Sequence, residues 1–108
     1  VTLSVDQVMF KQAIHVGELV TFLANVNYTG RTSMEIGIKV VAENIQTRKK
    51  RNTNSCYFTM VAIDDGKPVA VPPLNPTTEE QKRRFKQAEM RRKSRIEAEA
   101  RIRNVPAD

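Results

Sequence analysis

The sequence predicts an α+β chain in which a largely antiparallel sheet is followed by one long helix. Two observations predict it. Over much of residues 1–63, apolar side chains recur at every second position between turn-forming residues, which is the period of half-buried strands. After Pro76 this alternation stops, and a stretch rich in Glu, Lys and Arg follows two threonines suited to a helix start. The chain has 108 residues, enough for one small domain and not for two.

Four strands are expected, each with its own irregularity. The first slips out of alternation at Gln7, where we expect a bulge. Gly37 lies in the middle of the third strand, where we expect a bulge or a close approach by another backbone or by a ligand. The fourth strand is apolar on both faces, which predicts a central position in the sheet. The strands are expected at residues 1–10, 19–28, 33–44 and 55–63.

The connections are predicted from their turn-forming and polar residues. Lys11–Glu18 is expected to be a loop, and Thr29–Thr32 a tight turn in which Gly30 supplies a positive φ. Gln46–Asn54 contains four consecutive basic residues, so we expect an exposed hairpin loop. Asp64–Pro68 has the composition of a turn.

The helix is predicted from its capping residues and its charge spacing. Thr77 is the expected N-cap and Glu80 the third helical residue of a capping box, and Asn104 and Pro106 are expected to end the helix. Each of its five Glu residues has a basic residue four positions later, at about 0.2–0.5 kcal/mol per pair. Few of its residues are apolar, so we expect it to dock weakly or to extend outward. The sheet is therefore assigned to residues 1–76 and the basic helix and tail to residues 77–108.

The charge of the chain is concentrated in this helix. The net charge is +6, and Glu79–Arg103 holds ten Lys or Arg against five Glu. A basic tail on a nearly neutral body suggests an anionic partner, although it is also typical of a solvated helix face. No apolar run reaches 18 residues, so no membrane span is expected. The lone Cys56 provides no disulfide framework and favours a reducing compartment, which we predict to be the cytoplasm.

The sheet needs a cover that these residues do not supply. An apolar sheet face must be buried against another element, and the C-terminal helix has too few apolar side chains for this. Either a partner chain covers the sheet, or a helix lies upstream of Val1. We favour the upstream helix and expect the chain to be part of a longer domain.

Catalytic residues are not evident from local patterns. His15 has no Ser or Asp partner nearby, and Cys56 is interpreted as a core residue. Asp64 and Asp65 fit a turn better than acid–base chemistry. The sequence has no metal-ligand spacing, phosphate-binding loop or dinucleotide motif. Asp6, on the polar side of a strand beside the expected bulge, is a candidate for lining a binding site.

Several separated stretches carry a family resemblance. Val5–Phe10, Ile14–Glu18 and Tyr28–Ile36 resemble the acyl-CoA thioester hydrolases of the hotdog fold, and most closely the bacterial relatives of the cytosolic acyl-CoA hydrolase. The resemblance continues through Tyr57–Ala62, Val71–Leu74 and the basic tail, so it covers nearly the whole chain in the right order.

This resemblance implies a hotdog-type sheet wrapped around a central helix, and hydrolysis of an acyl-CoA to CoA and a carboxylic acid. The family's catalytic Asn or Asp lies upstream of the position matching Val1, so no catalytic residue is expected within this chain. CoA belongs to the substrate, and no separate cofactor is expected. The family's paired hotdogs, often assembled into hexamers, imply a dimer and a trimer of dimers here.

The resemblance also implies a CoA-binding turn, because the family's matching segment lies near the nucleotide end of CoA. Hydroxyl groups, a glycine that lets backbone N–H groups approach an oxygen, and an arginine that can bind a phosphate through two N–H groups suit such a role. Asp6 and Phe10 are further expected binding residues, Phe10 together with Met34 along the pantetheine or acyl tunnel. The residues concerned in the turn are Thr29, Gly30, Arg31, Thr32, Ser33 and Met34.

Arg91 and Arg92 of the basic helix are expected to add charge near the 3′-phosphate of CoA. Two other functions stay open from the sequence. One is a non-catalytic module that binds CoA or a nucleotide. The other is RNA binding through the Arg-rich helix, which is disfavoured because Phe85 is its only aromatic residue. A nucleic-acid partner is therefore not expected.

Overall fold

The computed structural model describes residues 1–5 and 9–104 of the chain. The expected bulge at Gln7 and the candidate Asp6 lie outside the described residues. The chain divides after Leu74 into two compact units, and each is described by itself.

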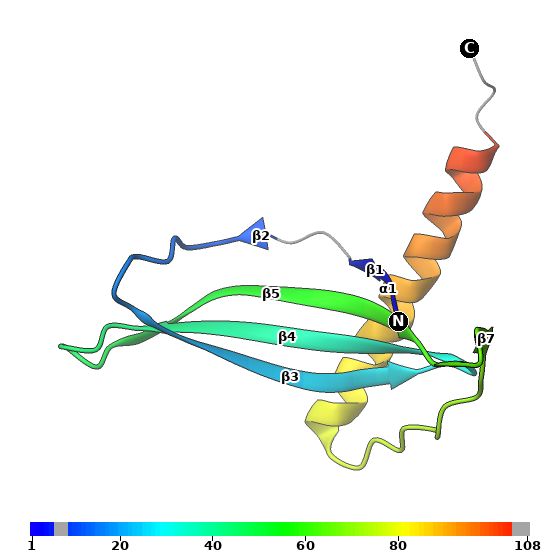
Figure 1. The fold of residues 1–108 in the computed structure, drawn as a ribbon, viewed down its shortest axis with the longest axis horizontal. Coiled ribbons are helices and arrows are strands. Elements are labelled where there is room, and N and C mark those ends of the chain that lie inside the picture. The colour runs from blue at the N-terminus through cyan, green and yellow to red at the C-terminus, as the bar shows by residue number, and fades with distance from the viewer. Residues whose placement is uncertain (6–8, 105–108) are drawn as a thin grey trace. The chain divides into compact units, whose positions relative to one another are not determined.

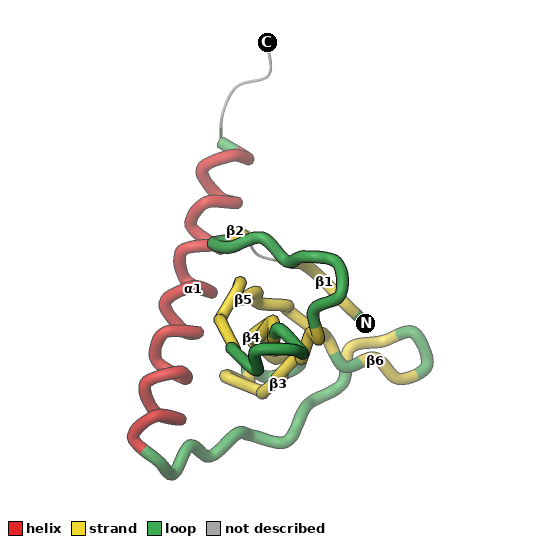
Figure 2. Tube along the Cα trace, turned by 90° about the vertical axis from the view of Figure 1, so that its left-hand side faces the viewer, coloured by secondary structure: helices red, strands yellow, loops and turns green. Residues whose placement is uncertain are grey.

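The first unit is an antiparallel sheet, as predicted (Figure 1). Its strands follow the order β1-β5-β4-β3. Both β1 and β2 pair with β5, β1 near residues 58–60 and β2 at residues 54–55. The fourth predicted strand, β5, therefore has neighbours on both sides, which confirms its central position. Figure 2 looks nearly along the long strands and shows that the sheet curls. The bounds are β1 Thr2–Val5, β2 Met9–Phe10, β3 Leu19–Thr29, β4 Ser33–Glu43 and β5 Lys50–Val61.

The β3–β4 hairpin is irregular at one position. Leu19 pairs with Glu43 and Asn25 with Gly37, but the register shifts between Val26 and Tyr28, which leaves Asn27 as the extra residue. A Cβ on Gly37 would lie less than 3.0 Å from Asn27 Nδ2. The close approach expected at Gly37 is therefore present. The group that approaches is the Asn27 side chain of the neighbouring strand, and not a backbone or a ligand.

The loop predicted at Gln46–Asn54 is shorter in the structure than the sequence indicated. β5 begins at Lys50, so Arg51–Asn54 are strand residues. Thr53 is fully buried and Asn54 is only 6% exposed. Polar residues occur here because Thr53 is the extra residue of a second bulge, where its Oγ1 donates to the carbonyl of Val40 at 3.3 Å. This hydrogen bond satisfies the buried hydroxyl group, which composition alone did not predict.

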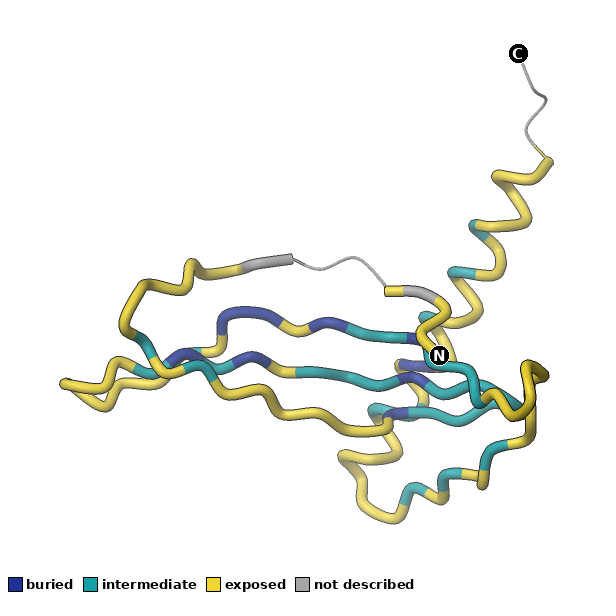
Figure 3. Tube along the Cα trace, viewed as in Figure 1, coloured by how far each residue is buried: buried dark blue, intermediate teal, exposed yellow. Residues whose placement is uncertain are grey.

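Burial is concentrated on β4 and β5 (Figure 3). Val40, Ala42 and Cys56 are the buried apolar residues of these strands, and Cys56 is a free thiol. β3 is mostly exposed, and its Phe22 is 68% exposed. The cross-strand register places Phe22 on the same face as Val40, so this apolar face is incompletely covered among the described residues, as the sequence predicted.

A short hairpin follows β5. Its strands are β6 Ile63–Asp64 and β7 Lys67–Pro68, joined through Asp65 and Gly66 at φ 51° and 76°. Two successive positive φ angles are typical of a tight hairpin turn. The turn predicted at Asp64–Pro68 is thus confirmed.

The second unit contains the helix α1, Glu79–Arg103, which ends at Asn104 as predicted. The N-cap prediction was wrong by one residue, because Thr78 is the N-cap and Gln81 completes the capping box. The side-chain oxygen of Gln81 also accepts from the backbone N–H of Thr77 at 2.9 Å, so a single Gln side chain serves both threonines.

Each of the five Glu residues of α1 was expected to form an ion pair with the basic residue four positions later. Two of these pairs form, Glu80–Arg84 and Glu99–Arg103, and the other three are not formed among the described residues. The described part of the chain has no helix long and apolar enough to cross a membrane.

Candidate functional site

The turn between β3 and β4 is closed by a hydrogen bond from Gly30 N to the carbonyl of Ser33 at 2.8 Å. Gly30 does not have a positive φ, so the predicted reason for its presence was wrong. A Cβ at this position would lie 3.1 Å from Ser33 Oγ. The residue is small because the Ser33 hydroxyl packs against it.

The segment after β5 fixes this turn from outside. Ala62 N donates to the carbonyl of Thr32 and Val71 N to that of Arg31, both at 2.9 Å. Leu74 N donates to Thr29 Oγ1 at 2.8 Å, which leaves the Thr29 hydroxyl hydrogen available to another acceptor. The turn is therefore held by its backbone. The Arg31 side chain is exposed and forms no ion pair among the described residues.

A buried polar pair links the ends of β3 and β4 that flank the turn. Asn27 Nδ2 donates to Glu35 Oε1 at 3.2 Å, and the two residues are 6% and 5% exposed. Glu35 pairs with the buried Thr59 on β5. Sequence reasoning missed Glu35 as a supporting residue. The available signal was Gly37, since a glycine in mid-strand leaves room for the Asn27 amide.

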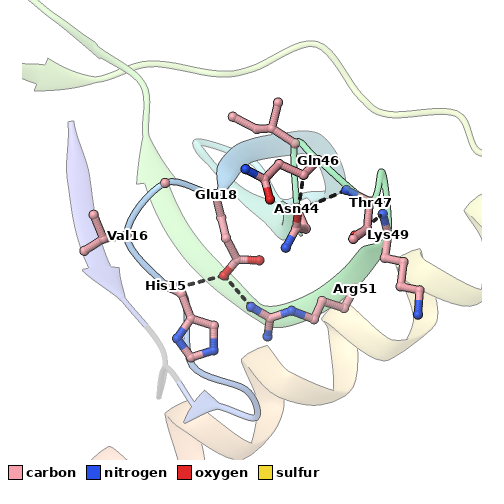
Figure 4. Close-up of a pocket in the computed structure, with 10 residues that line it drawn as sticks. His15, Val16, Glu18, Asn44, Gln46, Thr47, Lys49 and Arg51 are labelled. Atoms are coloured by element: carbon pink, nitrogen blue, oxygen red, sulfur yellow. Dashed lines mark hydrogen bonds and ion pairs between the residues drawn. The ribbon is translucent and has the colours of Figure 1, made fainter.

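A second polar feature lies at the other end of β3, about 35 Å from the turn for ten residues at 3.4 Å each. It is an open hollow of about 790 Å³ between the loop at residues 11–18 and the β4–β5 hairpin loop (Figure 4). We call it the hairpin hollow. Its lining residues are His15, Val16, Gly17, Glu18, Asn44, Ile45, Gln46, Thr47, Lys49 and Arg51.

Glu18 and Arg51 form the floor of the hairpin hollow (Figure 4). Glu18 Oε1 lies 2.5 Å from Arg51 Nη2 and accepts from His15 N at 2.7 Å. The Glu18 side chain is only 9% exposed. The backbone N–H of His15, and secondly Arg51, hold the pKa of Glu18 below its usual value although desolvation opposes this. The sequence did not predict this pair, because its members are 33 residues apart.

Arg51 also fixes the loop that precedes β3. Its Nη1 donates to the Gln12 side chain at 3.2 Å and to the carbonyl of Ala13 at 2.8 Å. One guanidinium group therefore joins β5 to both ends of this loop. In the described residues, no group of three or more His, Cys, Asp or Glu side chains is arranged to hold a metal ion.

Comparison with known proteins identifies the family. The model of the Thioesterase superfamily matches residues 1–49. A crystal structure of an apo-hexameric acyl-CoA thioesterase superposes with a TM-score of 0.87 at 40% identity, over 93% of this chain and 65% of that one. The acyl-CoA hydrolase of Staphylococcus aureus, solved with butyryl coenzyme A and coenzyme A, gives 0.78 at 33% identity, over 95% and 66%. The chain belongs to the hotdog-fold acyl-CoA thioester hydrolases.

A curated relative extends this comparison. The protein VdlD of Helicobacter pylori is 56% identical over 95 residues, which are 88% of this chain and 55% of VdlD. The chain thus spans about half the length of this relative. The hotdog sheet that was expected from sequence resemblance is confirmed by the superposition.

The structure brings the predicted turn residues of this hotdog sheet together and separates others from them. Residues 29–34 form one hairpin tip. Phe10 pairs with Asn54 of β5, and Met34 pairs with Met60 of the same strand. Asn54 and Met60 are six positions apart, so the backbones of Phe10 and Met34 lie about 20 Å from each other. Arg91 and Arg92 lie on α1 in the second unit and are described with that helix alone. Their predicted role in CoA binding stays a prediction.

Proposed function

We propose that the full-length protein is an acyl-CoA thioesterase, which hydrolyses an acyl-CoA to CoA and a carboxylic acid. In this proposal the present chain supplies the sheet and the turn that holds the nucleotide end of CoA. The observation that carries it is the turn itself, which presents an exposed Arg31 on a backbone fixed by Thr29, Thr32 and the following segment. Family membership supplies the reaction type.

A fixed turn suits the binding of a substrate handle. Because its carbonyl groups are already hydrogen-bonded to residues 62 and 71, the turn would lose little conformational entropy when CoA binds. The hydroxyl groups of Thr32 and Ser33 and the guanidinium group of Arg31 would donate to phosphate oxygens. Binding energy gained at this remote end can hold the thioester in place for attack by water.

The reaction itself needs water and the substrate alone. Water adds to the thioester carbonyl, the C–S bond breaks, and CoA leaves as the thiol while the acyl group becomes a carboxylic acid. We assign no catalytic residue to this chain. No cofactor enters the proposal, since CoA is part of the substrate.

The proposal includes self-association as a hotdog dimer and a trimer of dimers. The hexameric relative supports it, as does the long β3, whose outer edge has no neighbouring strand among the described residues. We also propose that the protein works in the cytoplasm, where the free and buried Cys56 would stay reduced.

A thiol-release assay on the full-length protein tests the reaction. Acyl-CoAs of short, medium and long chain length are supplied in turn, and free CoA is measured with a thiol reagent. Release with at least one chain length is expected. Binding of CoA without release for any chain length would contradict the enzyme and favour the non-catalytic CoA-binding module.

Arg31→Ala tests the turn. We expect CoA to bind about fivefold more weakly, because an exposed charged contact contributes about 1 kcal/mol, and to show a smaller dependence on salt. Arg101→Ala, an exposed arginine of α1 that forms no ion pair among the described residues, is the matched control. Equal affinity for both variants and the parent protein would remove Arg31 from the site.

A further inference from the structure

The hairpin hollow has the volume of a small-molecule site, but its lining is mostly polar. Its volume of about 790 Å³ falls within the ~300–1,000 Å³ typical of such sites. Val16 and Ile45 are the larger apolar side chains of its lining, and its other side chains are polar or charged.

The floor of the hairpin hollow is already neutralised. Glu18 is its one carboxylate among the lining residues, and Oε1 of that group is engaged by both Arg51 and the backbone of His15. A cation would have to compete with a guanidinium group that is held by three partners. The hairpin hollow is therefore poorly suited to a metal ion or an ammonium group.

The loop at residues 44–49, which forms one side of the hairpin hollow, is closed by its own hydrogen bonds and contains Lys49. Asn44 Oδ1 accepts from the backbone N–H groups of Gln46 and Thr47 at 3.0 and 3.1 Å (Figure 4). Arg48 has φ 63°, and its N–H donates to the carbonyl of Asn44 at 2.7 Å. These contacts close the loop and bring Lys49 to the hollow beside Arg51 (Figure 4).

Three consecutive basic residues of the β4–β5 hairpin are exposed. Arg48, Lys49 and Lys50 form no ion pair among the described residues, and each is exposed. The lining itself holds Lys49 and Arg51 against Glu18, a net charge of about +1, and Arg48 and Lys50 are the neighbours of Lys49 in the chain. A concave basic surface raises the local concentration of anions. A multivalent anion gains from several cations at once, whereas a single carboxylate does not.

We propose that the hairpin hollow binds a small phosphorylated molecule. Lys49 would contact its phosphate oxygens, together with the two N–H groups of Arg51 that its three partners among the described residues leave free. This site is separate from the turn at residues 29–34 and does not depend on the proposed thioesterase activity. Asn44, whose side-chain oxygen is used within the loop, still has an amide N–H₂ group that can donate to the same ligand.

Pyrophosphate is the probe, and it is titrated into the full-length protein at low salt by isothermal calorimetry. We expect saturable binding that weakens about fivefold in Lys49→Gln, since one exposed charged contact is lost. Lys49 is exposed, so this variant should fold normally. Lys86→Gln, an exposed lysine of α1 with no ion pair among the described residues, is the matched control and should bind as the parent does.

Arg31→Ala separates this site from the turn. The proposed turn would also bind phosphate, so Lys49→Gln is compared with Lys86→Gln in the Arg31→Ala background. Saturable pyrophosphate binding that persists in Arg31→Ala, and that only Lys49→Gln then weakens, supports the hairpin hollow. The proposal is overturned if Arg31→Ala shows no saturable binding, or if Lys49→Gln leaves the affinity unchanged in that background.

Discussion

Replacing Gly37 by alanine should destabilise the sheet through one identifiable contact. The new Cβ would lie less than 3.0 Å from Asn27 Nδ2 and 3.2 Å from its Cγ. Ordinary carbon contacts begin near 3.4 Å, so the Asn27 amide must move. Because Asn27 is 6% exposed and donates to Glu35, moving it disturbs a buried hydrogen bond.

Opposing effects set the change in the free energy of unfolding that Gly37→Ala causes. Overpacking in a well-filled site costs about 1–3 kcal/mol, and the weakened hydrogen bond to the Glu35 carboxyl group adds to this. Alanine in place of glycine within a strand returns about 0.5–1 kcal/mol. We therefore expect the free energy of unfolding to fall by about 2 kcal/mol. For a domain of this size, 2 kcal/mol corresponds to a decrease of about 10 °C in Tm.

A double-mutant cycle isolates the contact. Thermal and denaturant unfolding are followed by circular dichroism for Gly37→Ala, Asn27→Ala and the double variant. In the Asn27→Ala background there is room for the new methyl group, so Gly37→Ala should cost nothing further. A single Gly37→Ala variant within about 0.5 kcal/mol of the parent protein would refute the packing argument. So would equal costs in both backgrounds.

Two other predictions concern the helix start and the hairpin hollow. Thr78→Ala should lower the stability of α1 by about 1 kcal/mol, because it removes the N-cap, whereas Thr77→Ala should cost less; equal losses of helical circular dichroism would contradict this assignment. Glu18 has a pKa below its usual 4.5, so its charge stabilises the fold above that pH, and this contribution is lost as the pH falls through the lowered pKa. Denaturant midpoints of Glu18→Gln should therefore lie below those of the parent protein near neutral pH and converge with them in acid; a gap that is constant with pH would count against this.

Much of the fold could be predicted because its signals are local. Alternation identified the long strands, and Asp65 and Gly66 identified a tight turn that the structure confirms. Gly37 signalled a close approach because a missing side chain in mid-strand must leave space for something. Asn104 ended the helix where expected.

The remaining features depend on partners that are distant in sequence. Thr53 and Asn54 are polar, yet a bulge buries them in β5, which a loop prediction based on composition cannot foresee. Glu18 reaches Arg51 because the pairing of β2 with β5 places the following loop, residues 11–18, beside β5. The contacts of the candidate turn with residues 62–74 likewise arise from chain folding and not from local pattern.

In the proposed function, the turn binds the nucleotide end of CoA for a thioester hydrolase. The most direct test measures kcat/KM of the full-length protein and of Arg31→Ala with an acyl-CoA and with the matching acyl-pantetheine, which lacks the nucleotide. We expect kcat/KM for the acyl-CoA to fall about fivefold in the variant, mainly through KM, with no change for acyl-pantetheine. Equal losses with both substrates, or no thiol release from the acyl-CoA by the parent protein, would contradict the claim.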